Sequence, residues 1–270
     1  MIKVKPFLKW AGGKTQLLEN IILPDGDTYI EPFIGGGAVL FEVANRYENI
    51  IINDINTDLI TTYQTIKETP LKLITIMSGL ESEYNNCDDK KECYLNKRKL
   101  FNKRNSDNII QSALMIFLNK TCFNGLYRVN KSNGFNVPWN QKEKIKIFDK
   151  DNILNISKVL QKVTILNGNY DETLKYVKGD TIFYFDPPYK PVNKSNFNYA
   201  KLGFNDENQR ELAEFCMNLK HKWLLSNSDC VLFYDIYDGA YIKQIEAKRK
   251  INSKGDGRGA VMELLISNYD

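Results

Sequence analysis

The chain has 270 residues, of which 43% are hydrophobic and 26% are charged. This length and apolar content can build one large domain, or a domain with a sizeable insertion, and they exclude disorder as the main state. No uninterrupted apolar run approaches the ~18 residues that a membrane span requires. The first ten residues lack the apolar core of a secretory signal, so we expect a cytoplasmic protein with no membrane partner.

The cysteine and histidine content limits the chemistry that this chain can perform. The five cysteines never form a Cys-x-x-Cys pair and His221 is the only histidine, so no familiar zinc-ligand pattern is present. We therefore expect no metal site and no disulfide. A single histidine also leaves little room for a Ser-His-Asp triad or a Cys-His pair, so an enzyme with this sequence should work without imidazole.

Charge is unevenly distributed along the chain, although the net charge is only +4. Residues 60–165 contain 18 Lys and Arg against 10 Asp and Glu, a balance of +8, while the remainder has 19 against 23, a balance of −4. The middle segment is therefore either a solvated lysine-rich face or a polyanion-binding module inserted into a neutral or acidic domain.

The first predicted elements form a strand–loop–helix–strand unit. In chain order they are a strand at 28–33, a glycine turn at 35–37, a helix through 38–44 and a strand at 49–53. From about residue 59 to 118 the apolar spacing is helical. The aromatic-rich runs 122–130 and 134–139 follow, and the turn signal Asn124-Gly125 predicts that they form a β-hairpin.

Strand and helix signals return in the last third of the chain. In order they are a strand at 163–167, a helix at 171–177, a strand at 181–185, a helix from a capping box of Asp206 and Gln209 to Leu219, a strand at 223–226, and β segments at 241–251 and 261–269 around a mobile glycine-rich loop, 252–259. We interpret 163–167 and 181–185 as inner strands of a parallel sheet, because 181–185 is almost wholly apolar. The pattern predicts a doubly wound α/β sheet formed by residues 1–58 and 163–270, with a helical and β-hairpin insertion at 59–162.

The tetrapeptide Asp186-Pro187-Pro188-Tyr189 directly follows the apolar strand, at the carboxyl edge where open α/β sheets place their sites. The Asp186 carboxylate and the Pro187 carbonyl can both accept hydrogen bonds from an exocyclic amine, while Tyr189 stacks on a flat ring. A purely structural turn is the alternative. We favour capture of a ring that carries an NH2 group, because other signals coincide with this motif.

The glycine-rich turn after the first strand has the sequence Glu31-Pro-Phe-Ile-Gly-Gly-Gly37. Asp54 lies 19 residues after Gly35, near the spacing at which an acid in nucleotide-binding units contacts ribose hydroxyls. The third glycine of the dinucleotide fingerprint is absent, so a ligand with a ribose but no pyrophosphate fits better than NAD. Gly13-Lys14-Thr15 is similar to the end of a P-loop, but Leu8 occupies the position of its first glycine, which disfavours a nucleotide triphosphatase.

Six segments occur together in an order found in a known family. They are Phe7–Lys14, Glu31–Gly37, Asn53–Asn56, Phe123–Arg128 with Phe135–Pro138, Asp186–Tyr189 and Leu225–Asn227. Together they resemble the Dam-type DNA adenine N6-methyltransferases over nearly the whole chain. The resemblance implies a Rossmann-like fold and S-adenosylmethionine as cofactor, with residues 59–162 as the DNA-recognition domain between the two parts of the methyltransferase domain.

By position, the resemblance also implies roles for individual residues. The implied catalytic residues are Asp186, Pro187, Pro188 and Tyr189. The implied cofactor-binding residues are Trp10, Ala11, Gly12, Gly13, Lys14, Glu31, Phe33, Gly35, Gly37, Asp54 and Asp186. The implied DNA-binding residues are Lys9, Phe123, Asn124, Arg128 and Pro138. Of these, Arg128 would read a guanine and Phe123 would wedge beside an opened base pair.

The implied reaction is methyl transfer to N6 of an adenine flipped out of double-stranded DNA, within GATC or a site that shares its GAT core. The resemblance stops at residues 139–142, where the family has other residue types. Alternatives are an RNA adenine or protein glutamine N-methyltransferase and a nucleic-acid-binding module without activity; the hairpin favours duplex DNA, and the intact motifs favour catalysis. We expect a monomer, which acts alone, pairs with a restriction endonuclease or belongs to a phage.

Overall fold

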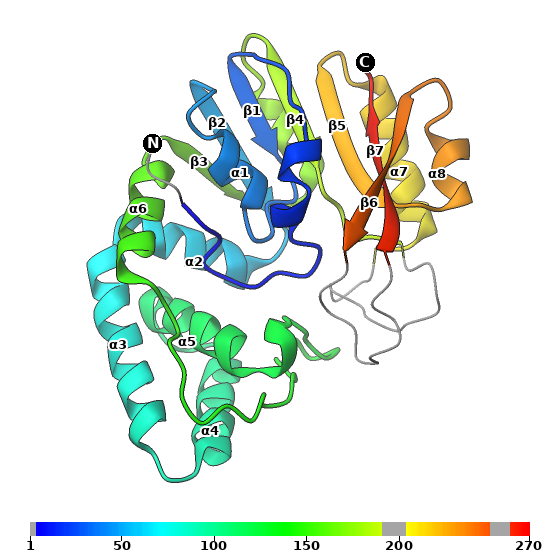
Figure 1. Cartoon of the computed structure of the whole chain (residues 1–270). Helices are drawn as coiled ribbons and strands as arrows, with labels where there is room; N and C mark the ends of the chain where they lie inside the picture. The colour runs from blue at the N-terminus through cyan, green and yellow to red at the C-terminus, as the bar shows by residue number, and fades with distance from the viewer. Residues whose placement is uncertain (1–3, 191–203, 249–259) are drawn as a thin grey trace.

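A computed structural model of the chain describes residues 4–190, 204–248 and 260–270. The strands form one mixed seven-stranded sheet, with helices on both faces (Figure 1). Its strands are β1 (Thr28–Glu31), β2 (Asn49–Asp54), β3 (Val163–Asn167), β4 (Thr181–Phe185), β5 (Lys222–Ser228), β6 (Tyr241–Lys248) and β7 (Ala260–Ser267).

The strands follow the order β3-β2-β1-β4-β5-β7-β6. The first five are parallel, and β7 pairs antiparallel with both β5 and β6. The carboxyl ends of β1 and β4 therefore lie side by side at the point where the strand order reverses, which is where doubly wound sheets bind ligands. The predicted doubly wound α/β class is confirmed.

The helices follow the predicted order with additions. They are α1 (Ala38–Val43), α2 (Thr57–Glu68), α3 (Pro70–Asn86), α4 (Lys90–Lys103), α5 (Asn108–Thr121), α6 (Lys150–Leu160), α7 (Asp206–Asn218) and α8 (Val231–Ile236). Side chains of Asn56, Asp89, Asp107 and Asp149 cap four of them by accepting a hydrogen bond from a first-turn N–H. The helical spacing predicted from 59 to 118 is confirmed as α2 to α5, whereas α6 and α8 were not predicted.

The two faces of the sheet bury different side chains because strand residues alternate. On β4, Phe183 and Phe185 face a core formed with α7 and α8. Tyr184 and Ile182 face the opposite way, into a second core that is continuous with the helices α1 to α6. All five β4 side chains are buried, as the apolar run predicted.

Three local predictions are corrected by the structure. Strand β3 is an edge strand rather than an inner one, and its residues after Val163 are partly exposed. The helix expected at 171–177 is a 3-10 helix, η4 (Tyr170–Tyr176), capped by Asn169. The capping box of α7 is formed by Asn205 and Asn208, not by Asp206 and Gln209, because Asn205 is the residue with an extended backbone before the first turn.

The predicted β-hairpin is present as two antiparallel arms without regular strands. Single β-bridges join Cys122 to Trp139 and Val129 to Phe135. The turn signal Asn124-Gly125 lies at the base of the hairpin, in the 3-10 turn η3 (Phe123–Gly125), where Asn124 has a left-handed φ of 56°. The chain reverses instead between Val129 and Phe135, so Asn124-Gly125 is not the hairpin turn that the sequence predicted. The late hairpin is confirmed as β6 and β7, while its predicted loop at 252–259 lies outside the described residues.

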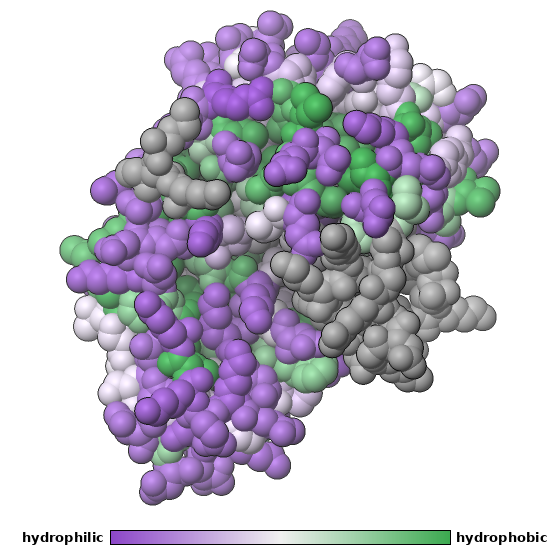
Figure 2. All heavy atoms as spheres, viewed as in Figure 1, coloured by the Kyte–Doolittle hydropathy of each residue, from purple (hydrophilic) through white to green (hydrophobic). Residues whose placement is uncertain are grey.

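Hydrophilic side chains cover much of the helical part that contains α3 and α4, at the lower left of Figure 2. Helix α4 is rich in basic residues, which include Lys97, Arg98, Lys99 and Lys103 in its second half. Of the helices that are described, none is both long and apolar enough to cross a membrane.

Candidate active site

Asp186 lies directly after β4, at the carboxyl edge of the sheet. One of its carboxylate oxygens, Oδ1, is 2.7 Å from the Nζ of Lys14 and accepts a 3.0 Å hydrogen bond from the hydroxyl of Ser226 on β5. Lys14 is only 3% exposed and begins the short 3-10 helix η1 (Lys14–Gln16), where its Nζ also donates to the Gly12 carbonyl. Three segments that are distant in the sequence, those of Lys14, Asp186 and Ser226, therefore meet at the Asp186 carboxylate.

A second buried carboxyl lies at the end of β1. Glu31 is 2% exposed and accepts a 2.7 Å hydrogen bond from the Tyr29 hydroxyl. Burial raises the pKa of Glu31 well above its usual range, and the Asp186 charge adds to this effect. Burial also raises the pKa of Asp186, whereas the Lys14 cation and the Ser226 hydrogen bond lower it. Lys14 is therefore the cation that favours an ionised Asp186.

The loop after Asp186 is held rigidly beside this pair. The Lys14 Nζ lies 4.6 Å from the centre of the Tyr189 ring, and the Tyr189 hydroxyl donates a 2.8 Å hydrogen bond to Glu263 on β7. The Pro188 carbonyl accepts a hydrogen bond from Gln209. The loop therefore holds a carboxylate and an aromatic ring in a fixed relation to one another.

Asp54 fastens the glycine-rich turn rather than standing free. Its two carboxylate oxygens accept hydrogen bonds from the backbone N–H of Gly35 at 3.1 Å and of Asn56 at 2.9 Å. Burial raises the pKa of Asp54 to about 6. Gly35 has a φ of 46°, and a Cβ at this position would lie 2.7 Å from the Trp10 ring, so only glycine fits beneath the indole.

Trp10 connects the glycine-rich turn to the hairpin. Its indole stacks on Tyr127, with ring centres 5.6 Å apart and an interplanar angle of 29°. Next to it, the buried Asn119 on α5 exchanges hydrogen bonds with both backbone groups of Lys9 and also donates to the Gly125 carbonyl. The N-terminal segment and the start of the hairpin are therefore fixed to one another.

The predicted DNA-binding residues line the hairpin and its base. Across the hairpin, Asn136 accepts from Arg128 twice, at 2.7 Å through its side chain and at 3.2 Å through its carbonyl. Phe123 is 43% exposed, and its N–H donates to the exposed Pro138. Burial lowers the pKa of Lys120 nearby, and the charges of Lys9 and Lys142 add to this effect, which marks a cluster of lysines.

Most of the predicted cofactor residues meet at the carboxyl edge of the sheet. These are Trp10, Lys14, Glu31, Gly35, Asp54 and Asp186, with Ala11, Gly12, Gly13 and Gly37 in the adjoining turns. Phe33 is turned toward the opposite face, where its ring packs against Tyr170 and Phe204.

Sequence reasoning assigned no positioning role to several residues that hold this site together. Asn119 and Glu263 were not singled out, Gln209 was assigned to a capping box, and Ser226 and Asn227 were noted only as part of the motif Leu225–Asn227. The signal for two of them was the polar run Ser226–Ser228 inside an otherwise apolar strand, since buried polar side chains in a strand need specific partners. Asn119 and Gln209 are single polar residues on helices and give no comparable signal.

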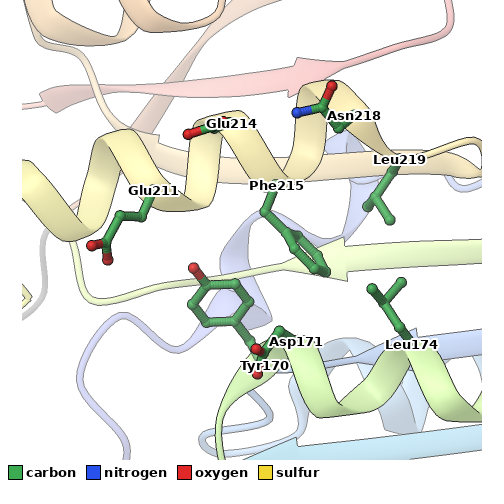
Figure 3. Close-up of a pocket in the computed structure, with 8 residues that line it drawn as sticks. All are labelled: Tyr170, Asp171, Leu174, Glu211, Glu214, Phe215, Asn218 and Leu219. Atoms are coloured by element: carbon green, nitrogen blue, oxygen red, sulfur yellow. The ribbon is translucent and has the colours of Figure 1, made fainter.

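A separate hollow of about 390 Å³ lies between η4 and α7 (Figure 3). Its carboxylates, Asp171, Glu211 and Glu214, would repel phosphate, so it is not part of a DNA-binding surface. Tyr170, which lines this hollow, also packs against Phe33 of the glycine-rich turn. Within the residues that the structure describes, no group of three or more His, Cys, Asp or Glu side chains is arranged to hold a metal ion.

Several known proteins are similar to this chain over nearly its whole length. The pattern of the D12 class N6 adenine-specific DNA methyltransferases matches residues 10–251. The type II methyltransferase M.MjaIII of Methanocaldococcus jannaschii is 47% identical over 99% of this chain and 100% of its own length. The type II methyltransferase M1.LlaDCHI of Lactococcus lactis subsp. cremoris is 35% identical (99% of this chain, 96% of its own), and a DNA adenine methylase of Vibrio cholerae is 36% identical (98% and 96%). The chain therefore belongs to the D12 class of N6 adenine-specific DNA methyltransferases.

Proposed function

We propose that this enzyme methylates N6 of an adenine that is flipped out of duplex DNA, within the sequence GATC. The observation that carries the proposal is the Asp186 carboxylate at the end of β4, paired with Lys14 and followed by two prolines and Tyr189. A flipped base leaves its stack and exposes its exocyclic amine to such a pocket. The GATC assignment rests on the resemblance to Dam-type enzymes.

The glycine-rich turn and its surroundings suit S-adenosylmethionine. The carboxyl groups of Glu31 and Asp186 lie close enough to the buried Lys14 cation to interact with it, and this mixture of acidic and basic groups suits the ammonium and carboxylate groups of an amino acid. Asn53 also has a buried Oδ1 for which the described residues provide no hydrogen-bond partner. In our proposal Trp10, Gly35 and Asp54 hold the nucleoside part, and Lys14 and Asp186 the amino acid part.

The residues of the Asp186 loop then perform the chemistry on adenine. S-adenosylmethionine, when bound, supplies a methyl group made electrophilic by the sulfonium charge. The Asp186 carboxylate and the Pro187 carbonyl each accept one N6 proton in a hydrogen bond, which stabilises the positive charge that develops on the nitrogen. Tyr189 stacks on the ring and holds the nitrogen in line with the methyl group. The carbon–sulfur bond would break as the bond to N6 forms, so that the thioether S-adenosylhomocysteine leaves, and the surplus N6 proton would be released to solvent. None of these steps requires imidazole.

The segment 59–162 is proposed to select the target sequence. Arg128 is aimed by Asn136 and can donate to the O6 and N7 atoms of guanine together, while Phe123 is exposed and suited to fill the space left by the flipped base. The lysines around Lys120 offer positive charge for DNA phosphates. The name type II methyltransferase of two relatives supports a pairing with a restriction endonuclease.

One labelling experiment tests this proposal against its alternatives. The wild-type protein and Asp186→Ala are incubated with S-adenosylmethionine labelled in its methyl group and with duplex DNA, RNA or protein, and the products are digested to nucleosides or amino acids. We expect label only in N6-methyladenine from DNA, and only with the wild-type protein. Label in RNA or glutamine, or equal labelling by Asp186→Ala, would contradict the proposal.

A further inference from the structure

Gln209 is a polar residue on the apolar face of α7. The same face carries Leu212, Ala213 and Cys216 into the core beside β4 and β5. Gln209 is fully buried there, and its Nε2 donates a 2.9 Å hydrogen bond to the carbonyl of Pro188. Burying a side-chain amide costs free energy unless its groups are bonded, so its placement calls for a specific reason.

Asn227 on β5 completes the arrangement from the other side. Its Nδ2 donates to the Oε1 of Gln209 at 3.2 Å, and its Oδ1 accepts from the backbone N–H of Lys190 at 3.3 Å. The two amides therefore hold the Pro188 carbonyl and the Lys190 N–H. These groups belong to the two peptide planes that flank Tyr189, so the pair fixes the backbone on both sides of the aromatic ring.

The backbone of the loop that follows Asp186 has little remaining conformational freedom. The rings of Pro187 and Pro188 fix φ at both positions, so the direction of each carbonyl depends on ψ alone. Gln209 removes that freedom at Pro188. Among the described residues, no donor contacts the Pro187 carbonyl, which leaves this oxygen for a ligand.

We infer that Gln209 and Asn227 form a buried amide clamp that positions Tyr189 and the Pro187 carbonyl for methyl transfer. Gln209 is a positioning residue: it contacts neither the adenine nor the cofactor, and it acts through the loop. The inference rests on the proposed function, because it assigns the loop to adenine. Loss of the Gln209 amide slows methyl transfer. Cofactor binding persists, because the residues of the glycine-rich turn are unchanged.

Gln209→Met tests this inference, with Gln111→Met as the matched control. Gln111 on α5 is also a buried helical glutamine, and its Nε2 donates at 3.0 Å to the carbonyl of Phe101, a residue of α4. At saturating cofactor and DNA, Gln209→Met should lower the single-turnover rate of methyl transfer by about 10- to 100-fold, because a displacement of about 1 Å at a reacting group has an effect of this size. Gln111→Met should retain the wild-type rate, and both should retain wild-type cofactor affinity.

A second measurement does not depend on the substrate. Hydrogen exchange of the loop amides of Tyr189 and Lys190 should become faster in Gln209→Met and stay unchanged in Gln111→Met. Gln209→Glu restores the donor only when its carboxyl is protonated, so its rate relative to wild type should rise as the pH is lowered.

Wild-type loop exchange in Gln209→Met, or a wild-type rate in the folded variant, would overturn the clamp. Absence of N6-methyladenine with the wild-type enzyme would instead overturn the proposed function, and the exchange measurement would still decide the inference about Gln209.

Discussion

Replacing Lys14 by methionine should raise the pH below which methyl transfer is lost. The Lys14 cation is buried and lies 2.7 Å from Asp186 Oδ1, and it opposes the rise that burial causes in the pKa of Asp186. An opposite charge this close lowers the pKa of an aspartate by about 1 to 3 units, which corresponds to about 1.4 to 4 kcal/mol in favour of the ionised form. Without Lys14, Asp186 therefore takes up its proton at a higher pH and stops accepting a hydrogen bond from N6.

The pH dependence of the single-turnover rate, at saturating cofactor and DNA, measures this effect. Activity depends on ionised Asp186, so it is present above the pKa and lost as the pH falls through it. In Lys14→Met this acidic limb should move upward by about 1 to 3 pH units. Ser226→Ala is the control: it removes a neutral hydrogen bond to the same oxygen, and the limb should move in the same direction by less. An unmoved limb in a Lys14→Met variant that still binds cofactor would refute the role of this ion pair.

Three further predictions follow from the site. Cofactor affinity, measured by calorimetry, should decline as the pH drops below about 6, because the raised pKa of Asp54 then leaves its carboxyl group protonated. Asp54→Asn should bind the cofactor more weakly and without this pH dependence. A wild-type affinity that does not change with pH would contradict this role of Asp54. Arg128→Ala should lose about 1 to 3 kcal/mol of discrimination at one guanine of GATC, measured as methylation rates on substituted duplexes at one salt concentration. Lys142→Ala should instead slow methylation of all duplexes alike. An equal loss on every duplex in Arg128→Ala would show that Arg128 contacts the DNA backbone and not a base. Asn119→Leu should lower the free energy of unfolding by about 1 to 3 kcal/mol in urea titrations, because it leaves the backbone groups that Asn119 binds unpaired. Asn86→Leu, at an exposed position, should change the free energy of unfolding by less than about 0.5 kcal/mol. Equal effects of the two substitutions would show that the Asn119 hydrogen bonds do not stabilise the fold.

The position of Asp186 could be predicted from the sequence because two independent patterns coincide there. An apolar run of five residues is typical of a central strand, and the acid that follows it must then lie at the carboxyl edge of the sheet. The same logic placed Glu31 at the end of β1. Parallel pairing brings those two edges together, so the meeting of the catalytic and glycine-rich segments followed from the fold class.

The partners of these residues could not be predicted in the same way. Asn205 and Asp206 are both good helix caps, and a local pattern cannot decide which of them precedes the first turn. Assigning the cap to Asp206 placed Gln209 in a capping box and hid its contact with Pro188. Likewise, the apolar content of β3 suits an inner or an edge strand, and only the pairing order shows which.

Side-chain amides hold the backbone in three parts of this site. Asn119 joins the N-terminal segment to the hairpin, Asn53 donates to the carbonyls of Pro32 and Gly168, and Gln209 with Asn227 holds the Asp186 loop. An amide can donate and accept at once without carrying charge. A buried aspartate or lysine in these places would act on the pKa of Asp186 through a medium that screens poorly. These neutral anchors fix the backbone without adding a charge beside Asp186. Its ionisation is then set by burial, by the Lys14 cation and by the Ser226 hydrogen bond, which favour a carboxylate that can act on a developing positive charge.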